Sequence, residues 1–121
     1  MILGAIHAAG KGAPPTPLLP RVWRARSAWE RLRGLLGRAP LAPDEALLIE
    51  PCASVHTFGM RYPIDLAFLD RNGRVLRIVA AVKPRRVALR PGARATLEMA
   101  PGAAAALGLR TGDRLEWREA A

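Results

Sequence analysis

The chain has 121 residues and a formal net charge of +9, and half of its residues are hydrophobic. This length fits one domain, and the apolar content excludes a globally disordered chain. The single cysteine excludes an internal disulfide, and no run approaches the roughly 18 consecutive apolar residues of a membrane-spanning helix. The apolar start lacks the basic region of a secretory signal, so we expect a cytoplasmic protein.

Nearly all of the positive charge is arginine, because the only lysines are Lys11 and Lys83. A basic surface attracts polyanions such as nucleic acid. However, the arginines are scattered, and they accompany abundant alanine, proline and glycine. This pattern favours a compositional origin of the charge. We therefore expect an unknown small molecule or protein as the partner, with nucleic acid as the less favoured alternative.

Residues 1–20 are rich in glycine and proline, and the prolines exclude a helix in this segment. We predict an extended or poorly ordered lead-in over residues 1–20, followed by a single β-rich domain over residues 21–121. Residues 21–25 alternate between polar and apolar side chains, which predicts a short strand.

A helix is predicted next. Ser27 and Glu30 form a capping-box pattern, and Gly37 is a suitable C-terminal cap. Between them, apolar residues follow at helical spacing: Trp29, Leu32, Leu35 and Leu36. The apolar run over residues 46–49 then predicts a buried strand.

An Asn-Gly dipeptide separates two apolar runs, residues 64–69 and 75–82. Asn72 and Gly73 can supply the positive φ angles of a type I′ turn, so we predict a β-hairpin.

The C-terminal third continues this pattern of short elements. We predict a loop with a short edge strand over residues 83–94, a strand over residues 95–99 with Leu97 facing inward, helical turns over residues 103–107, and a final strand over residues 114–117. Short strands between turn signals predict a mainly β (α+β) fold, namely a small bent sheet or barrel-like domain with one N-terminal helix and a short C-terminal helix.

The segment from His56 to Asp70, HTFGMRYPIDLAFLD, with Gly73 and Val75 after it, resembles the signature of the domain of unknown function family numbered 192. Residues 31–36, and the pieces 97–102 and 108–113, resemble the flanking patterns of that family, so the resemblance spans roughly residues 21–117. It implies a small, β-rich bacterial or archaeal protein without an assigned activity, and it assigns no catalytic residue and no cofactor.

Within the distinctive segment, five residues are candidates for a binding site: His56, Phe58, Met60, Arg61 and Asp65. His56 can titrate near neutrality and act as a base, a ligand or a switch. Phe58 and Met60 can form an apolar wall of a pocket, although core packing explains them equally. Asp65 lies inside an apolar strand, where a carboxylate needs a partner. Arg61 or Arg33 can supply it in a structural pair.

Other chemistry is poorly supported by the sequence. Cys52 and His56 are four residues apart, and an extended chain of that length spans roughly 13 Å, so a nucleophile–base pair needs a tight turn. We predict no metal site, because a structural zinc site needs about four ligands and the chain offers only Cys52, His56 and His7. No cofactor is predicted.

The densest basic stretch runs from Lys83 to Arg86, with Arg90 and Arg94 nearby. It can grip phosphates. It contains no aromatic residue for base stacking, and a solvated edge loop is the simpler interpretation.

Three functional hypotheses follow. The first is a binding or accessory module with a ligand site near residues 52–65. The second is a small enzyme that uses His56 and Asp65, and the third is a basic nucleic-acid-associated protein. For the site we expect His56 and Asp65 at one accessible cleft, with Arg61 close to the carboxylate.

Overall fold

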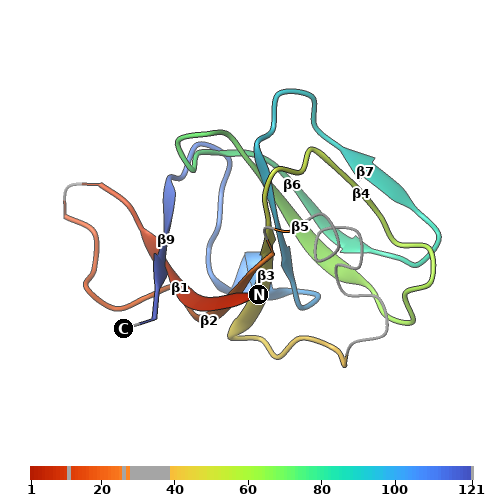
Figure 1. The fold of residues 1–121 in the computed structure, drawn as a ribbon, viewed down its shortest axis with the longest axis horizontal. Helices are drawn as coiled ribbons and strands as arrows, with labels where there is room; N and C mark the ends of the chain where they lie inside the picture. Colours follow the sequence, from red (N-terminus) through yellow and green to blue (C-terminus); the bar gives the residue numbers. More distant parts are fainter. Residues whose placement is uncertain (11, 26, 28–38, 121) are drawn as a thin grey trace.

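The computed structural model describes residues 1–10, 12–25, 27 and 39–120. Seven strands form one sheet in the order β6-β5-β8-β3-β2-β1-β9, and two short strands form a separate ribbon, β4-β7 (Figure 1). The strands are β1 (Ile2–Ala8), β2 (Leu19–Ala25), β3 (Glu45–Ile49), β4 (Ser54–His56), β5 (Ile64–Leu69), β6 (Val75–Val82), β7 (Val87–Leu89), β8 (Ala95–Met99) and β9 (Leu115–Glu119). The helix α2 (Ala103–Ala106) contacts β5.

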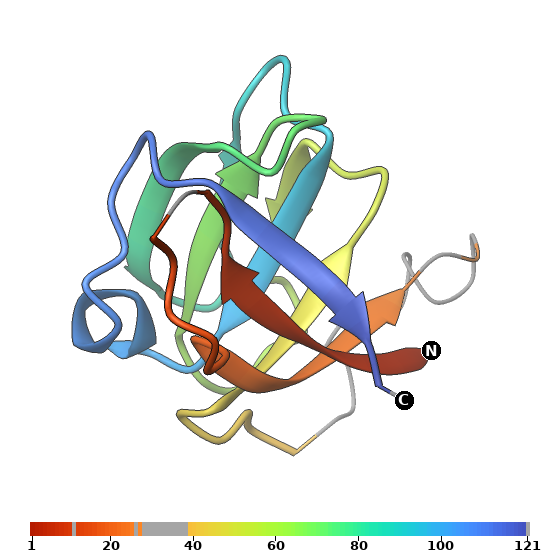
Figure 2. The ribbon, with the colours of Figure 1, turned by 90° about the vertical axis from the view of Figure 1, so that its left-hand side faces the viewer.

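The large sheet is curled into a half-barrel, as the view in Figure 2 shows. Its neighbouring strands are antiparallel except β2 and β3, which run parallel. The outermost strands, β6 and β9, do not pair along their length, but backbone bonds connect their beginnings. The Val75 amide donates to the Asp113 carbonyl, and the Leu115 amide donates to the Gly73 carbonyl, each at 2.8 Å.

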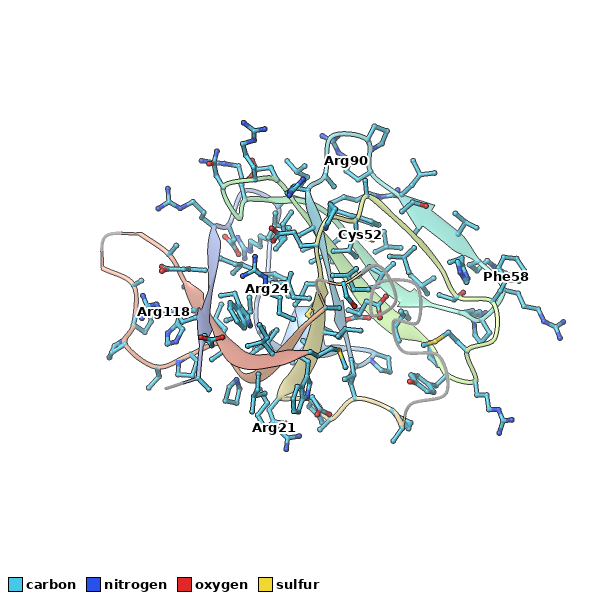
Figure 3. All side chains as sticks on the ribbon, in the orientation of Figure 1. Arg21, Arg24, Cys52, Phe58, Arg90 and Arg118 are labelled. Carbon is cyan, nitrogen blue, oxygen red and sulfur yellow. The ribbon has the colours of Figure 1, made fainter. Side chains whose placement is uncertain are left out.

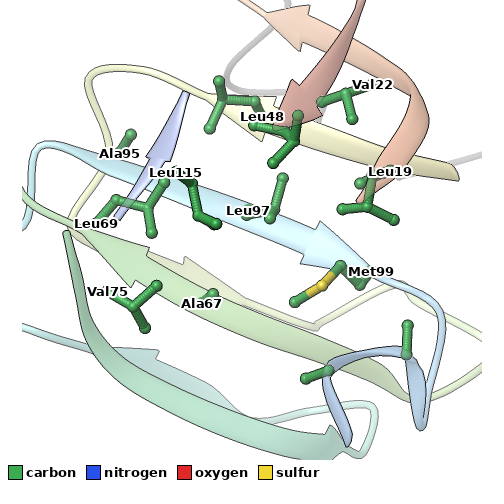
Figure 4. Packing of buried hydrophobic residues seen from close by; sticks show 14 of the residues in the cluster. Leu19, Val22, Leu48, Ala67, Leu69, Val75, Ala95, Leu97, Met99 and Leu115 are labelled. Atoms are coloured by element: carbon green, nitrogen blue, oxygen red, sulfur yellow. The ribbon is translucent and has the colours of Figure 1, made fainter. Parts of the chain in front are cut away.

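The concave face of the sheet carries the inner cluster of buried apolar side chains. Its members come from strands at opposite ends of the sheet, because the curl brings these strands face to face (Figure 4). The largest contributions come from Ile6, Leu19, Leu48, Leu69, Leu97, Met99 and Leu115. Ala103 and Ala104 of α2 belong to the same cluster, so the helix lies on the concave side.

The other face of the sheet carries the outer cluster, which includes Leu47, Ile64, Leu66 and Phe68. The β4–β7 ribbon packs on this face through Val55 and Ala88. Every residue of the central strands β5 and β8 is therefore buried, whichever face its side chain occupies.

Much of the predicted architecture is confirmed. The chain is mainly β, its sheet is barrel-like, and the short C-terminal helix is present. The strands predicted over residues 64–69, 75–82 and 95–99 have the predicted bounds. The predicted N-terminal helix lies, apart from Ser27, outside the described residues, and the described part of the chain shows only α2 as a helix. No helix there has the length and apolar character needed to cross a membrane.

Residues 2–8 are extended, as predicted, but they are part of the sheet and do not form a separate lead-in. Residues 2–8 form β1, which lies between β2 and β9 and pairs with both. Ile6 in this strand is 1% exposed. The turn formers act only in the connection between β1 and β2, where Gly10 and Gly12 have positive φ. A composition averaged over residues 1–20 hides the strand that precedes them.

The hairpin between β5 and β6 is confirmed, but its turn type differs from the prediction. Gly73 has φ +80°, whereas Asn72 is not among the residues with positive φ, so the turn is not type I′. The Gly73 amide donates to the Asp70 carbonyl at 3.1 Å, and the Asp70 amide donates to the Arg74 carbonyl at 2.9 Å. This is the longer hairpin loop in which a type I turn is followed by a left-handed glycine.

Candidate functional site

The β4–β7 ribbon presents one face to the outer cluster and one face to solvent. Val55 pairs with Ala88, and both point into the cluster. Side chains alternate along a strand, so His56 and its neighbours across the ribbon, Val87 and Leu89, point outward. His56 pairs directly with Val87, and all three side chains are exposed.

Phe58 extends this outward face beyond the end of β4. Its ring centroid lies 6.1 Å from that of His56, and the two rings are tilted by 45°. Phe58 is 52% exposed, Val87 59% and Leu89 47%. In Figure 3 Phe58 lies at the periphery of the molecule, beyond the end of the ribbon.

A buried threonine fixes the basic loop beside this face. The Thr57 hydroxyl donates to the Lys83 carbonyl at 2.6 Å and accepts from the Arg86 amide at 2.9 Å. The backbone amide of Thr57 also donates to the Arg86 carbonyl at 2.8 Å, and the Arg85 amide donates to the Thr57 carbonyl at 3.2 Å. Thr57 is 0% exposed. The loop from Lys83 to Arg86 is thus tied to the residue between His56 and Phe58.

The ribbon places aromatic side chains beside the basic stretch, which contains none of its own. No aromatic residue lies within residues 83–94, but the pairing of β4 with β7 places His56 and Phe58 next to them. Lys83, Arg85 and Arg86 precede β7 in the chain, and all three are exposed. Apolar, aromatic and basic groups therefore share one solvent-facing surface.

Two of the remaining predicted site residues lie next to this surface. Arg61 is exposed in the loop after Phe58. Met60 is half-buried and packs against the outer cluster, so core packing accounts for part of its side chain. Cys52 is also half-buried, and its thiol donates to the Ser54 carbonyl at 3.3 Å. His56 and Cys52 form no pair among these contacts, and no group of three potential metal ligands occurs in the described residues.

Asp65 lies on the other side of the sheet from the ribbon. Its neighbours Ile64 and Leu66 face the outer cluster, so the Asp65 side chain faces α2 and the inner cluster. It is 1% exposed. The sheet separates Asp65 from His56, so the structure does not bring the two into one cleft.

The partners of Asp65 are backbone amides in place of the expected arginine. One carboxylate oxygen accepts from the Ala81 amide at 2.8 Å, and the other accepts from the Ala104 amide at 3.0 Å. Ala81 has φ +49° and lies where the pairing register of β5 and β6 shifts. The register shift is a β-bulge, which leaves the Ala81 amide without a partner in the β5–β6 ladder, and the Ala104 amide lies in the first turn of α2. The Asp65 carboxylate accepts a hydrogen bond from each of these two amides. Arg33, the other expected partner, lies outside the described residues.

Glu98 is a buried acid that the sequence analysis did not single out. It pairs with Leu47 of β3 and Leu66 of β5, and it faces the apolar outer cluster with them. It is 4% exposed, and its Oε2 atom has no hydrogen-bond partner. Burial raises the pKa of Glu98 to about 7. Because side chains alternate along β8, Glu98 points to the face of the sheet opposite to that of Leu97. Glu98 is buried because the outer cluster covers that face.

Solved structures of other proteins share this fold. A search of curated proteins gave no match. A protein of unknown function from Novosphingobium aromaticivorans DSM 12444 has 26% sequence identity and a TM-score of 0.78, over 95% of this chain and 85% of that chain. A protein from Sinorhizobium meliloti 1021, whose name suggests a transcription regulator, has 22% identity and a TM-score of 0.81, over 95% of this chain and 93% of that chain.

The family is shown by the sequence itself. The model of DUF192, a family described as uncharacterised, matches residues 13–117. This match covers most of the chain, including β2 to β8 and most of β9. It confirms the resemblance carried by the segment from His56 to Asp70. The chain therefore belongs to the DUF192 family.

Proposed function

We propose that this protein is a binding or accessory module that recognises an acidic protein segment through the outward face of the β4–β7 ribbon. One observation carries the proposal. Of the five large apolar side chains that are most exposed in the described residues, three lie on this face: Phe58, Val87 and Leu89. Single exposed apolar residues are ordinary on protein surfaces, but a contiguous group marks a site of interaction.

The surrounding charges define the kind of partner. The loop from Lys83 to Arg86 and the residues Arg90 and Arg61 add cations around the apolar group. These cations attract an acidic partner and oppose pairing of the face with a second copy of itself. The apolar side chains then supply the contact area. The position of this face, beside residues 52–65, agrees with the first hypothesis from the sequence.

Single-stranded nucleic acid is the second candidate. The tilted pair of His56 and Phe58 offers aromatic surface for base stacking beside arginines. The name of the Sinorhizobium meliloti protein points in the same direction for that protein. Val87 and Leu89 favour the protein partner, because aliphatic side chains contribute apolar contact and no stacking surface.

Fluorescence anisotropy with two labelled probes tests the proposal. One probe is a designed peptide of glutamate, leucine and phenylalanine, and the other is an oligothymidylate. We expect the peptide to bind and the variants Phe58→Ser and Val87→Ser to weaken it by about tenfold each, which corresponds to about 1.4 kcal/mol. Ile2→Ser is the matched control, because Ile2 is an exposed apolar residue on β1, away from the ribbon.

Two outcomes count against the acidic segment. If Ile2→Ser weakens peptide binding as much as Val87→Ser does, the ribbon is not the binding face. If only the oligothymidylate binds, with a steep dependence on salt that is reduced in Arg86→Gln, the nucleic-acid candidate replaces it. Circular dichroism of each variant establishes that it is folded before binding is compared.

A further inference from the structure

We propose that the mouth of the half-barrel is a second binding site, which takes a small organic carboxylate with an apolar body. A cavity of about 240 Å³ opens between the ends of β2, β3, β8 and β9 and the β5–β6 turn. Its walls include Leu48, Leu69 and Leu115 of the inner cluster, which are labelled in Figure 4. Mouths of β-barrels are common places for small-molecule sites.

Arg24 supplies the polar anchor of this cavity. It lies on the same face of β2 as the buried Val22, so its side chain points into the curl. Its Nη2 atom donates to Oε1 of Glu50 at 3.3 Å. Its Nε atom is buried and has no hydrogen-bond partner. The Arg24 side chain as a whole is half-buried, but its buried Nε–H favours an additional acceptor, because an unpaired buried donor has lost its hydration without compensation.

The guanidinium is held in place before any ligand arrives. It lies 5.0 Å from the centroid of the Trp117 ring, which supports it from one side. The Trp117 indole in turn donates to the Val22 carbonyl at 3.1 Å. Gly4 makes room for this ring, because a Cβ at that position would lie 2.6 Å from it. Such preorganisation lowers the entropic cost of binding.

The charges around Arg24 favour an anion. Glu50 is shared by two arginines, since Nε of Arg94 lies 3.9 Å from the same Oε1 atom. The Glu50 carboxylate thus faces the guanidinium groups of Arg24 and Arg94, so these three side chains together carry one net positive charge. The other acids of the lining have partners of their own. Asp70 accepts from the amides of the β5–β6 turn, which lowers its pKa, and Glu116 pairs with Arg118 at 3.4 Å.

The shape and composition of the cavity narrow the ligand further. A carboxylate matches the planar donor edge of a guanidinium. The aliphatic walls and the indole favour an apolar body attached to that carboxylate over a bare inorganic anion. The small volume limits the body to a short aliphatic chain or a single ring. This site is on a different part of the chain from the β4–β7 ribbon, so the two proposals stand or fall separately.

The probe we choose is butyrate, and the readout is the indole N–H signal of Trp117 in ¹H–¹⁵N spectra of the full chain. The chain has three tryptophans, so Trp23→Phe and Trp29→Phe identify the signal by elimination. We expect butyrate to shift the Trp117 signal saturably. Butanol, which lacks the charge, and inorganic phosphate, which lacks the apolar body, should leave it unchanged at the same concentration.

Variants of the ion pairs make the test specific. Arg24→Gln should weaken butyrate binding by about tenfold, because a charge-assisted hydrogen bond is lost. Glu50→Gln should strengthen it severalfold, because the competing carboxylate is removed. Arg21→Gln is the matched control, since Arg21 is on the same strand but pairs with Glu45 outside the cavity. It should leave the affinity unchanged.

Several results would overturn the proposal. These are the absence of a saturable butyrate shift, equal affinity in the wild-type protein and Arg24→Gln, or equal binding of phosphate and butyrate. If Arg24→Gln does not fold, Glu50→Gln decides the matter, because unchanged or weaker butyrate binding in that variant contradicts an anion site at Arg24.

Discussion

Glu98 and Asp65 are buried carboxylates on opposite faces of the same pair of strands, and their surroundings differ. Asp65 accepts from two backbone amides, which compensate its burial. Glu98 lies among apolar side chains with Oε2 unpaired. Burial therefore favours the protonated form of Glu98, and this acid is neutral over much of the range in which an exposed glutamate is ionised.

The raised pKa of Glu98 makes the stability of the protein depend on pH. The folded state holds this proton up to a pKa of about 7, whereas the ordinary pKa of a glutamate side chain is 4.5. Between these values the folded state binds more protons than the unfolded state, so stability falls as pH rises from 4.5 to 7. We expect Glu98→Gln to stabilise the protein by roughly 3 kcal/mol at alkaline pH and by little in acid.

Urea unfolding of wild-type protein and Glu98→Gln on both sides of this range measures the effect. Glu116→Gln serves as the control, because Glu116 is about half-exposed and its ion pair with Arg118 is at the surface. The same change in stability for Glu98→Gln at both ends of the range would show that Glu98 does not titrate with a raised pKa.

At the scale of elements, the β5–β6 hairpin is held by contacts beyond its own turn. The Leu115 amide donates to the Gly73 carbonyl, and a Cβ on Gly73 would lie 2.1 Å from the carbonyl oxygen of the same Leu115. Gly73 therefore satisfies two demands, a left-handed backbone and close approach of another strand.

We expect Gly73→Ala to destabilise the protein by more than the left-handed backbone alone accounts for, which is about 1–2 kcal/mol. Gly112→Ala is the matched control, because Gly112 has φ +94° and open space around its missing Cβ. Thermal unfolding of both variants separates the two effects. Equal losses in the two would mean that the contact between the turn and β9 contributes nothing.

The positions of the strands were more predictable from the sequence than the contacts between residues that are distant in the chain. The two apolar runs and the Asn-Gly dipeptide between them located β5 and β6, because these signals are local. The turn type was missed, since it depends on which residue after Asp70 takes the left-handed backbone. The candidate site stays a prediction. Residues 56–61 lie at the end of β4 and in the loop after it, but no local pattern indicates that Val87 and Leu89 pair beside His56, that Glu98 is covered, or that Arg24 stacks on Trp117.

At the scale of the whole molecule, β1 is a structural part of the half-barrel. It supplies Ile6 to the inner cluster and pairs with strands on both sides. We expect Ile6→Ala to cost about 2–5 kcal/mol, because a large buried side chain is removed. Ile2→Ala on the same strand should cost far less, since Ile2 is 36% exposed. Urea unfolding measures both, and similar small losses would mean that β1 is not docked.

The position of β1 between β2 and β9 also has a consequence during synthesis on the ribosome. The partner on one side, β2, follows within the next residues, but the partner on the other side is the last strand of the sheet to be made. Until β9 emerges, one edge of β1 keeps its backbone donors and acceptors free, and such an edge can pair with a neighbouring nascent chain. The sheet is therefore complete only after β9 has been made. The interval between the synthesis of β1 and that of β9 is the period in which a chaperone would protect this protein.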